Sequence, residues 1–85
     1  MSIKIKKENQ QIKVSDLALA ASISIYYPIE AIDRPPNSNR CFFLFEKNEE
    51  LKTLIDNYHK GEMRVEPARF FNQIKIIKSR LYGTE

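Results

Sequence analysis

RCFFLFE, residues 40–46, is the strongest strand signal in the chain. Its five consecutive apolar residues, Cys41 to Phe45, predict a strand that is covered on both faces and therefore lies at the centre of a sheet. Residues 29–34 are also strand-like, and the intervening segment Pro35-Pro36-Asn37-Ser38-Asn39 consists of turn-forming residues. We therefore expect an antiparallel hairpin of residues 29–46 with a five-residue loop.

A helix is predicted upstream of this hairpin, over residues 16–26, DLALAASISIY. Apolar residues surround it almost completely and several are small, which is typical of a helix packed at the centre of a domain. Ser15 is expected to cap its first turn. Pro28 is expected to end it, because the residue before a proline avoids the α region.

The N-terminal segment alternates apolar and polar residues over 2–7 and again at Ile12 and Val14. This pattern predicts either a small edge hairpin or a mobile arm, residues 1–11, followed by one short strand. Lys4, Lys6 and Lys7 fit both interpretations, since exposed lysines protect a sheet edge and also suit an arm that contacts an anionic partner.

Two further helices are predicted in the second half of the chain. Residues 49–60 follow the capping residue Asn48 and precede Gly61, which suits a left-handed C-terminal position. The next helix begins at Pro67 and is stopped by Gly83. Its core face is predicted to consist of Phe70, Ile74, Ile77 and Leu81, and that of the preceding helix of Leu51, Leu54, Ile55 and Tyr58.

These elements together predict one α+β domain over residues 1–85. The expected order is β(β)–α–β–β–α–(β)–α, with three helices and a small, mainly antiparallel sheet. Parentheses mark strands that the pattern supports only weakly, and the one before the last helix is a short edge strand at residues 63–65. Because the chain has 85 residues and is 42% hydrophobic, it can form one compact core.

Composition narrows the classes of function. The single cysteine, Cys41, cannot form an internal disulfide, and we expect it to behave as a small buried apolar residue. We expect no membrane association, since there is no run of 18 apolar residues, and a cytoplasmic location. The net charge is +3, with a basic N-terminus, an acidic middle and a basic segment at 64–82, which suits either an anionic partner or internal complementarity.

The residues that enzymes and metal sites require are sparse. His59 is the only histidine, and its place at the end of a helix accounts for it. No second histidine, cysteine or paired carboxylate stands at ligand spacing, so we expect neither a metal nor a cofactor. The hydroxyl residues lack a nucleophile motif. The chain is therefore expected not to be an enzyme.

The third helix carries the candidate binding residues. Outside its core face lie Arg69, Gln73, Lys75, Lys78 and Arg80. Lysine and arginine neutralise phosphates, and an amide side chain can read base edges. We therefore predict that these five residues contact nucleic acid or a nucleoprotein complex, with Lys4, Lys6 and Lys7 as an additional arm.

Three alternatives remain open at this stage. The basic residues could simply form a solvated helix surface. Ile76 lies about 130° from the centre of the core face. If Phe71 or Tyr82 is also exposed, the patch would indicate a protein partner or a homodimer that uses these three residues. Arg34 and Arg40 flank the Pro-Pro loop, where they could hold a phosphate at the hairpin mouth or pair with Asp33 or Glu30.

The chain also contains a pattern of spaced residues over 14–82, most specific at its C-terminal end. The pattern comprises Asp16-Leu17, Ala20-Ala21, Phe43-x-Phe45, Leu51-x-x-Leu54-x-x-x-Tyr58-x-x-Gly61, Val65-x-Pro67-x-x-Phe70-Phe71 and Ile74-x-x-Ile77-Lys78-x-x-Leu81-Tyr82. In these residues the chain resembles a loosely defined family of short bacterial, phage and mobile-element proteins of unassigned function. The resemblance implies a single domain and a phage or mobile-element setting, and it assigns no catalytic residue or ligand.

Overall fold

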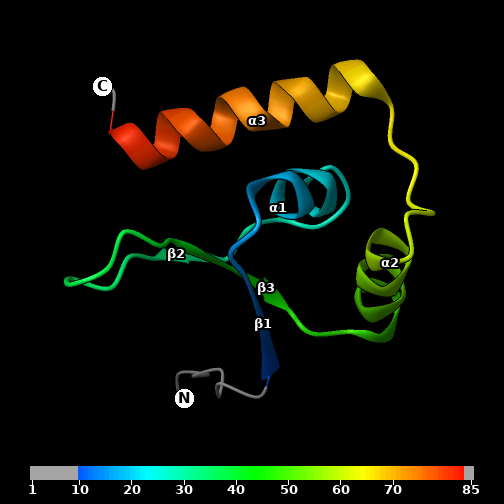
Figure 1. The fold of residues 1–85 in the computed structure, drawn as a ribbon, viewed down its shortest axis with the longest axis horizontal. Helices are drawn as coiled ribbons and strands as arrows, with labels where there is room; N and C mark the ends of the chain where they lie inside the picture. The colour runs from blue at the N-terminus through cyan, green and yellow to red at the C-terminus, as the bar shows by residue number, and fades with distance from the viewer. Residues whose placement is uncertain (1–9, 84–85) are drawn as a thin grey trace, which may run out of the picture.

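The computed structural model of the chain describes residues 10–83. A sheet, a central helix and an outer helix are stacked in three layers, with another helix at one end (Figure 1). This architecture confirms the predicted α+β fold. The elements in chain order are β1 (Gln11–Val14), α1 (Leu17–Ser24), β2 (Ala31–Asp33), β3 (Phe42–Glu46), α2 (Glu49–His59) and α3 (Pro67–Tyr82).

The sheet of the described residues has three antiparallel strands in the order β1-β3-β2. The central position of β3 and the antiparallel pairing of β2 with β3 are thus confirmed, but residues 34–41 connect the two strands, so the loop is longer than the five residues predicted. In the register, Phe43 lies between Val14 of β1 and Ile32 of β2, and Phe45 lies opposite Ile12. These five apolar side chains share the sheet face that packs against α1, because side chains alternate between the faces of a strand.

The prediction that both faces of β3 are covered was only half correct. Phe43 and Phe45 are buried, whereas Phe42 and Leu44, on the opposite face, are half-buried. No helix of residues 10–83 packs on that face. Instead the Lys13 ammonium and the Arg40 guanidinium lie 5.7 and 5.5 Å from the centre of the Phe42 ring. Cations over an aromatic face stabilise such a half-exposed ring without a second layer.

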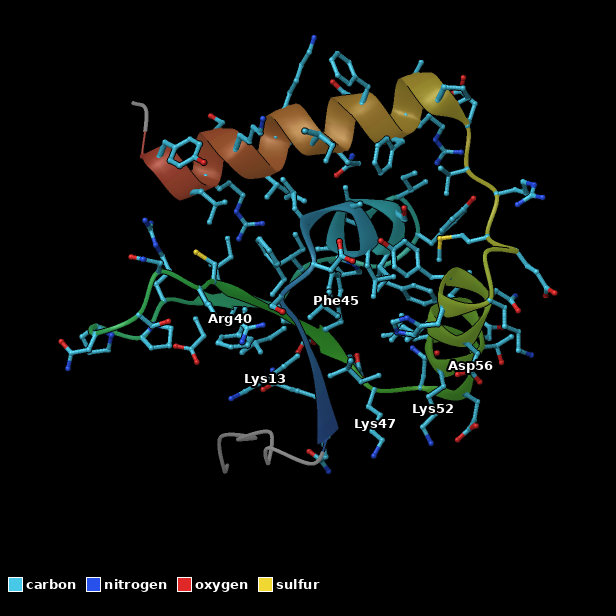
Figure 2. All side chains as sticks on the ribbon, in the orientation of Figure 1. Lys13, Arg40, Phe45, Lys47, Lys52 and Asp56 are labelled. Atoms are coloured by element: carbon cyan, nitrogen blue, oxygen red, sulfur yellow. The ribbon has the colours of Figure 1, made fainter. Side chains whose placement is uncertain are left out.

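The core lies between the sheet and α1 and extends to both other helices. Phe45 points from the sheet into this region (Figure 2). Ala20 and Ala21 of α1 are fully buried, and their small side chains let neighbouring layers approach the helix closely. The predicted central packing of this helix is confirmed. The buried apolar residues are Val14, Leu19, Ala20, Ala21, Ile23, Phe43, Phe45, Leu51 and Ile77.

The N-terminus of α1 differs from the expectation. Asp16, not Ser15, is the N-cap residue, and its Oδ1 accepts a hydrogen bond from the Leu19 amide at 3.2 Å. Its other oxygen accepts one from the Tyr58 hydroxyl of α2 at 2.8 Å. A carboxylate at this position caps the helix and complements its dipole, so the helix begins one residue later than predicted. Ser15 Oγ instead accepts a hydrogen bond from Arg40.

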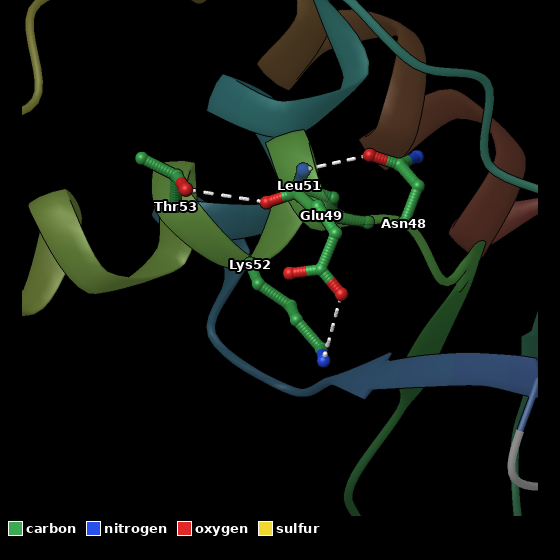
Figure 3. A network of polar contacts seen from close by, with 5 residues as sticks. All are labelled: Asn48, Glu49, Leu51, Lys52 and Thr53. Atoms are coloured by element: carbon green, nitrogen blue, oxygen red, sulfur yellow. Dashed lines mark hydrogen bonds and ion pairs between the residues drawn. The ribbon is translucent and has the colours of Figure 1, made fainter.

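The predicted start of α2 is confirmed, and the helix ends at His59, one residue before the predicted end. Asn48 Oδ1 accepts a hydrogen bond from the Leu51 amide at 2.8 Å (Figure 3). In the same turn Lys52 and Glu49 form an exposed salt bridge of 3.3 Å. Gly61 follows the helix with φ of 74°, a left-handed conformation that glycine adopts without a steric penalty.

The segment between α2 and α3, residues 62–66, forms no strand, so the predicted edge strand at 63–65 was wrong. This segment passes beside the helices and does not reach an edge of the sheet (Figure 1). Glu66 then caps α3 by accepting a hydrogen bond from the Arg69 amide at 2.8 Å. The predicted start at Pro67 and the stop at Gly83, whose φ is 60°, are both confirmed.

Candidate functional site

Helix α3 lies along the outer edge of the molecule and packs across α1 (Figure 1). Ile77 is fully buried, and Phe70, Ile74 and Leu81 pack against the core on either side of it. The predicted core face is therefore confirmed. Outside this core face, the residues of the 16-residue helix are exposed, with the exception of Gln73.

This outer surface is basic. Pro67–Tyr82 contains no aspartate or glutamate, and Arg69, Lys75, Lys78 and Arg80 are all exposed. None of these four residues forms an ion pair with a carboxylate of residues 10–83. The acidic residues in the middle of the chain therefore do not neutralise these four cations by ion pairing within residues 10–83.

Two of the four cations lie over aromatic rings. The Lys75 ammonium is 5.3 Å from the centre of the Phe71 ring, and the Arg69 guanidinium is 6.0 Å from that of Tyr26 on α1. Such contacts hold a cation in place and leave its charge intact. Lys75 and Arg69 can therefore both attract an anion.

The four cations occupy two flanks of the helix. With a rotation of about 100° per residue, Arg69 and Arg80 lie on one side of the outermost line and Lys75 and Lys78 on the other, each pair on average about 80° from it. We call these the arginine flank and the lysine flank. Between them runs an outer ridge of three exposed residues with short side chains, Ala68, Asn72 and Ser79.

Gln73 does not join the predicted site in the expected way. Its side chain is half-buried, and its amide oxygen accepts a hydrogen bond from the Ser24 hydroxyl of α1 at 3.0 Å. The neighbouring residue Asn72 is the exposed amide on the outer ridge. The sequence prediction named residues at the borders of the core face and omitted Asn72, although helical rotation places this residue almost opposite the core.

The apolar candidates Phe71, Ile76 and Tyr82 have exposed fractions of 60%, 44% and 70%. They do not form one patch. Phe71 and Tyr82 lie on the lysine flank, separated by about 16 Å along the axis, whereas Ile76 lies on the arginine flank. A flat partner surface can therefore not cover all three at once.

The two arginines of the hairpin mouth point to different partners. Arg34 Nη1 donates a hydrogen bond to the Leu81 carbonyl at the end of α3, at 2.7 Å. Arg40 Nη2 donates to Ser15 Oγ at 3.1 Å. These contacts tie the hairpin to α3 and to the start of α1, and they engage both side chains that the phosphate clamp would need. Lys4, Lys6 and Lys7 lie outside the described residues.

A shallow groove of about 380 Å³ lies between the end of α1 and α2. Its lining includes Tyr26, Tyr27, Thr53 and Leu54, with Glu50 accepting a hydrogen bond from the Tyr27 hydroxyl at 2.5 Å. This hydrogen bond raises the pKa of Tyr27 because it stabilises the neutral phenol. The groove could not be predicted from sequence patterns, since its lining residues come from two separate segments.

The pairing of Asp16 with Tyr58 perturbs both groups. The hydrogen bond from Tyr58 lowers the pKa of Asp16 and raises that of Tyr58. Asp16 also caps α1, so this pair is explained by the joining of α1 to α2.

The described part of the chain offers few features of other kinds of site. No group of three histidine, cysteine, aspartate or glutamate residues within 10–83 is arranged to hold a metal ion. No helix in this range is both long and apolar enough to cross a bilayer. Cys41 is a free, half-buried thiol that packs against the edge of the core.

The fold and its surface thus define a small α+β domain with an outer helix, α3, whose charged residues are all basic and exposed. The chain belongs to the family described as Domain of unknown function (DUF5659), which matches residues 9–83. This match confirms the expectation of a family without an assigned function. No curated protein and no solved structure matches the chain.

Proposed function

We propose that this protein is a small non-enzymatic module that binds nucleic acid, alone or in a nucleoprotein complex, through α3. One observation carries the proposal: four exposed cations stand on a helix without a carboxylate, and no carboxylate of residues 10–83 pairs with them. Unpaired cations at this density attract a polyanion, because neutralising phosphates releases the counterions that surround them.

The setting proposed for this activity is a phage or mobile element, in the cytoplasm. The resemblance of residues 14–82 to short bacterial, phage and mobile-element proteins supports it. The genes next to this one provide the test. Neighbours that encode phage or transposition functions would support the setting, and neighbours confined to housekeeping metabolism would refute it.

The binding test uses the whole chain and fluorescently labelled duplex DNA, single-stranded DNA and single-stranded RNA at low salt. We expect binding that is lost in the double variant Lys75→Glu with Lys78→Glu. The matched control is Lys47→Glu with Lys52→Glu, since these residues lie on the side of the molecule away from α3 (Figure 2). Absence of binding to all three probes would refute the proposal, and so would equal losses in the two double variants.

The exposure of Ile76, Phe71 and Tyr82 favours a second function, that of a protein-binding adaptor or inhibitor. Its partner is then either a different protein or a second copy of this chain. In the homodimeric form, light scattering should give twice the monomer mass, and Ile76→Asp should restore the monomer without unfolding it. A monomeric mass for the unchanged protein would exclude the homodimer. The arrangement of these residues on two flanks makes this the weaker candidate.

A further inference from the structure

We infer that α3 enters the major groove of duplex DNA, with Asn72 facing the base edges and the two cationic flanks facing the two sugar–phosphate strands. This inference rests on the proposed function and makes it specific, because it names one class of nucleic acid and one base-reading residue.

The positive charge of α3 is distributed on two sides of the helix. The arginine and lysine flanks lie symmetrically, on average about 80° to either side of the outermost line of α3. A flat anionic surface or one strand laid along the helix neutralises one flank and leaves the other in water. A groove with an anionic wall on each side neutralises both, so the charge pattern of α3 complements a groove.

The major groove also matches an α-helix in size. An α-helix with its side chains is about 10–12 Å across, and the major groove of B-form DNA is about 12 Å wide. The side chains that would enter first are those of the outer ridge, Ala68, Asn72 and Ser79. Because all three are short, the helix axis can approach the floor of the groove closely.

The side chains of the outer ridge have the chemistry that base edges require. An asparagine side chain forms a bidentate pair with the N6 and N7 atoms of adenine, and an alanine methyl contacts the thymine methyl. Asn72 is exposed, and it lies one turn from Ala68 on the same face of the helix. This pair therefore suits an A·T-containing site read in the major groove.

Other nucleic acids fit this surface less well. Single-strand binding relies on aromatic rings that stack successive bases, but the exposed rings of Phe71 and Tyr82 lie about 16 Å apart along the axis. The Phe71 ring is also contacted by Lys75. In duplex RNA the major groove is deep and too narrow for side chains to read the bases.

The experiment compares the affinity of the whole chain for duplex DNA, duplex RNA and single-stranded DNA of equal length. A preferred duplex sequence is then selected from a random library with the unchanged protein and with Asn72→Ala. We expect duplex DNA to bind most tightly, and an adenine preference of about tenfold at one position that Asn72→Ala abolishes. Replacing that adenine with 7-deazaadenine, which lacks N7, should weaken binding of the unchanged protein and not of the variant.

The outcomes distinguish failure of the proposed function from failure of this inference. No binding to any nucleic acid removes the proposed function and this inference with it. Tighter binding to single-stranded DNA or to duplex RNA overturns the inference alone. Duplex binding without any base preference, or with a preference that survives Asn72→Ala, also overturns the inference and leaves the proposed function intact.

Discussion

The salt dependence of binding tests the two-flank geometry of α3 directly. Each phosphate that a protein neutralises on duplex DNA contributes about −0.9 to the slope of log association constant against log salt concentration. If all four cations of α3 contact phosphates, the slope is about −3.6. Raising the salt concentration from about 50 to about 200 mM should then weaken binding about 150-fold.

Two double variants remove one flank each. Arg69→Gln with Arg80→Gln and Lys75→Gln with Lys78→Gln should each reduce the slope to about −1.8, so that the same change in salt weakens binding only about 12-fold. The two effects should be equal, because each flank carries two exposed cations. Fluorescence anisotropy with a labelled duplex over a series of salt concentrations measures all three slopes.

Neutralising the same number of charges elsewhere provides the control. Lys47→Gln with Lys52→Gln removes two cations from the side of the molecule opposite α3 and should leave the slope unchanged (Figure 2). If one flank variant changes the slope and the other does not, the ligand lies along one side of the helix and the two-flank reasoning is refuted. Equal slopes in the control and flank variants would show that attraction depends on net charge alone.

Three further predictions concern the fold. Ile77→Ala should lower the free energy of unfolding by about 2–5 kcal/mol in urea denaturation, because it opens a cavity at a fully buried site. Ile76→Ala, at the half-exposed neighbouring residue, should lower it far less, and equal losses in the two variants would contradict the packing of α3 on α1. The hydrogen bond from Tyr58 lowers the pKa of Asp16, so the ionised Asp16 carboxylate should stabilise the fold above pH 3.8, and this stabilisation should be lost as the pH falls through the lower folded-state pKa. Asp16→Asn should lack this pH-dependent part of the unfolding free energy, and identical profiles of unfolding free energy against pH for the two proteins would contradict the prediction. Gly61→Ala should cost about 1 kcal/mol in thermal or urea unfolding through backbone strain alone, because φ is 74° and no atom lies within 4 Å of the added methyl; an unchanged stability would show that the left-handed end of α2 is not required.

The elements of the fold could be predicted where a local pattern determines them. Period-3.6 spacing gave the core face of α3, and the consecutive apolar residues of β3 gave its central place. Asn48 and Gly61 marked the ends of α2 because capping and positive φ depend on single residues. Each of these signals lies within a few residues of the structure it determines.

The wrong predictions involve contacts between distant segments. Asp16 replaces Ser15 as the N-cap, and it also accepts a hydrogen bond from Tyr58, 42 residues away. The far face of β3 has no second layer in the described residues, and cations over Phe42 screen it instead. Sequence periodicity contains neither piece of information.

In the candidate site, too, the sequence predicted what depends on one helix and not what depends on contacts with another segment. Helical rotation correctly placed Arg69, Lys75, Lys78 and Arg80 outside the core. The engagement of Gln73 could not be foreseen, because its partner Ser24 comes from α1. The position of Asn72, almost opposite the core, follows from helical rotation alone and was therefore predictable from the sequence.

The placement of charge on α3 is not what helix stability alone would favour. Arg80 complements the negative C-terminal end of the helix dipole, but Arg69 lies in the first turn, where a cation is unfavourable. Lys75 and Lys78 are like charges three residues apart, which costs about 0.2–0.5 kcal/mol and which a carboxylate one turn away would offset. Pro67–Tyr82 contains no such carboxylate, although the rest of the chain contains 11 acidic residues. The rings of Phe71 and Tyr26 contact Lys75 and Arg69, but no carboxylate within 10–83 pairs with these cations. Departures from local rules of this kind are expected at functional surfaces. Arg69, Lys75 and Lys78 therefore support an anionic partner more strongly than the net charge of the chain does.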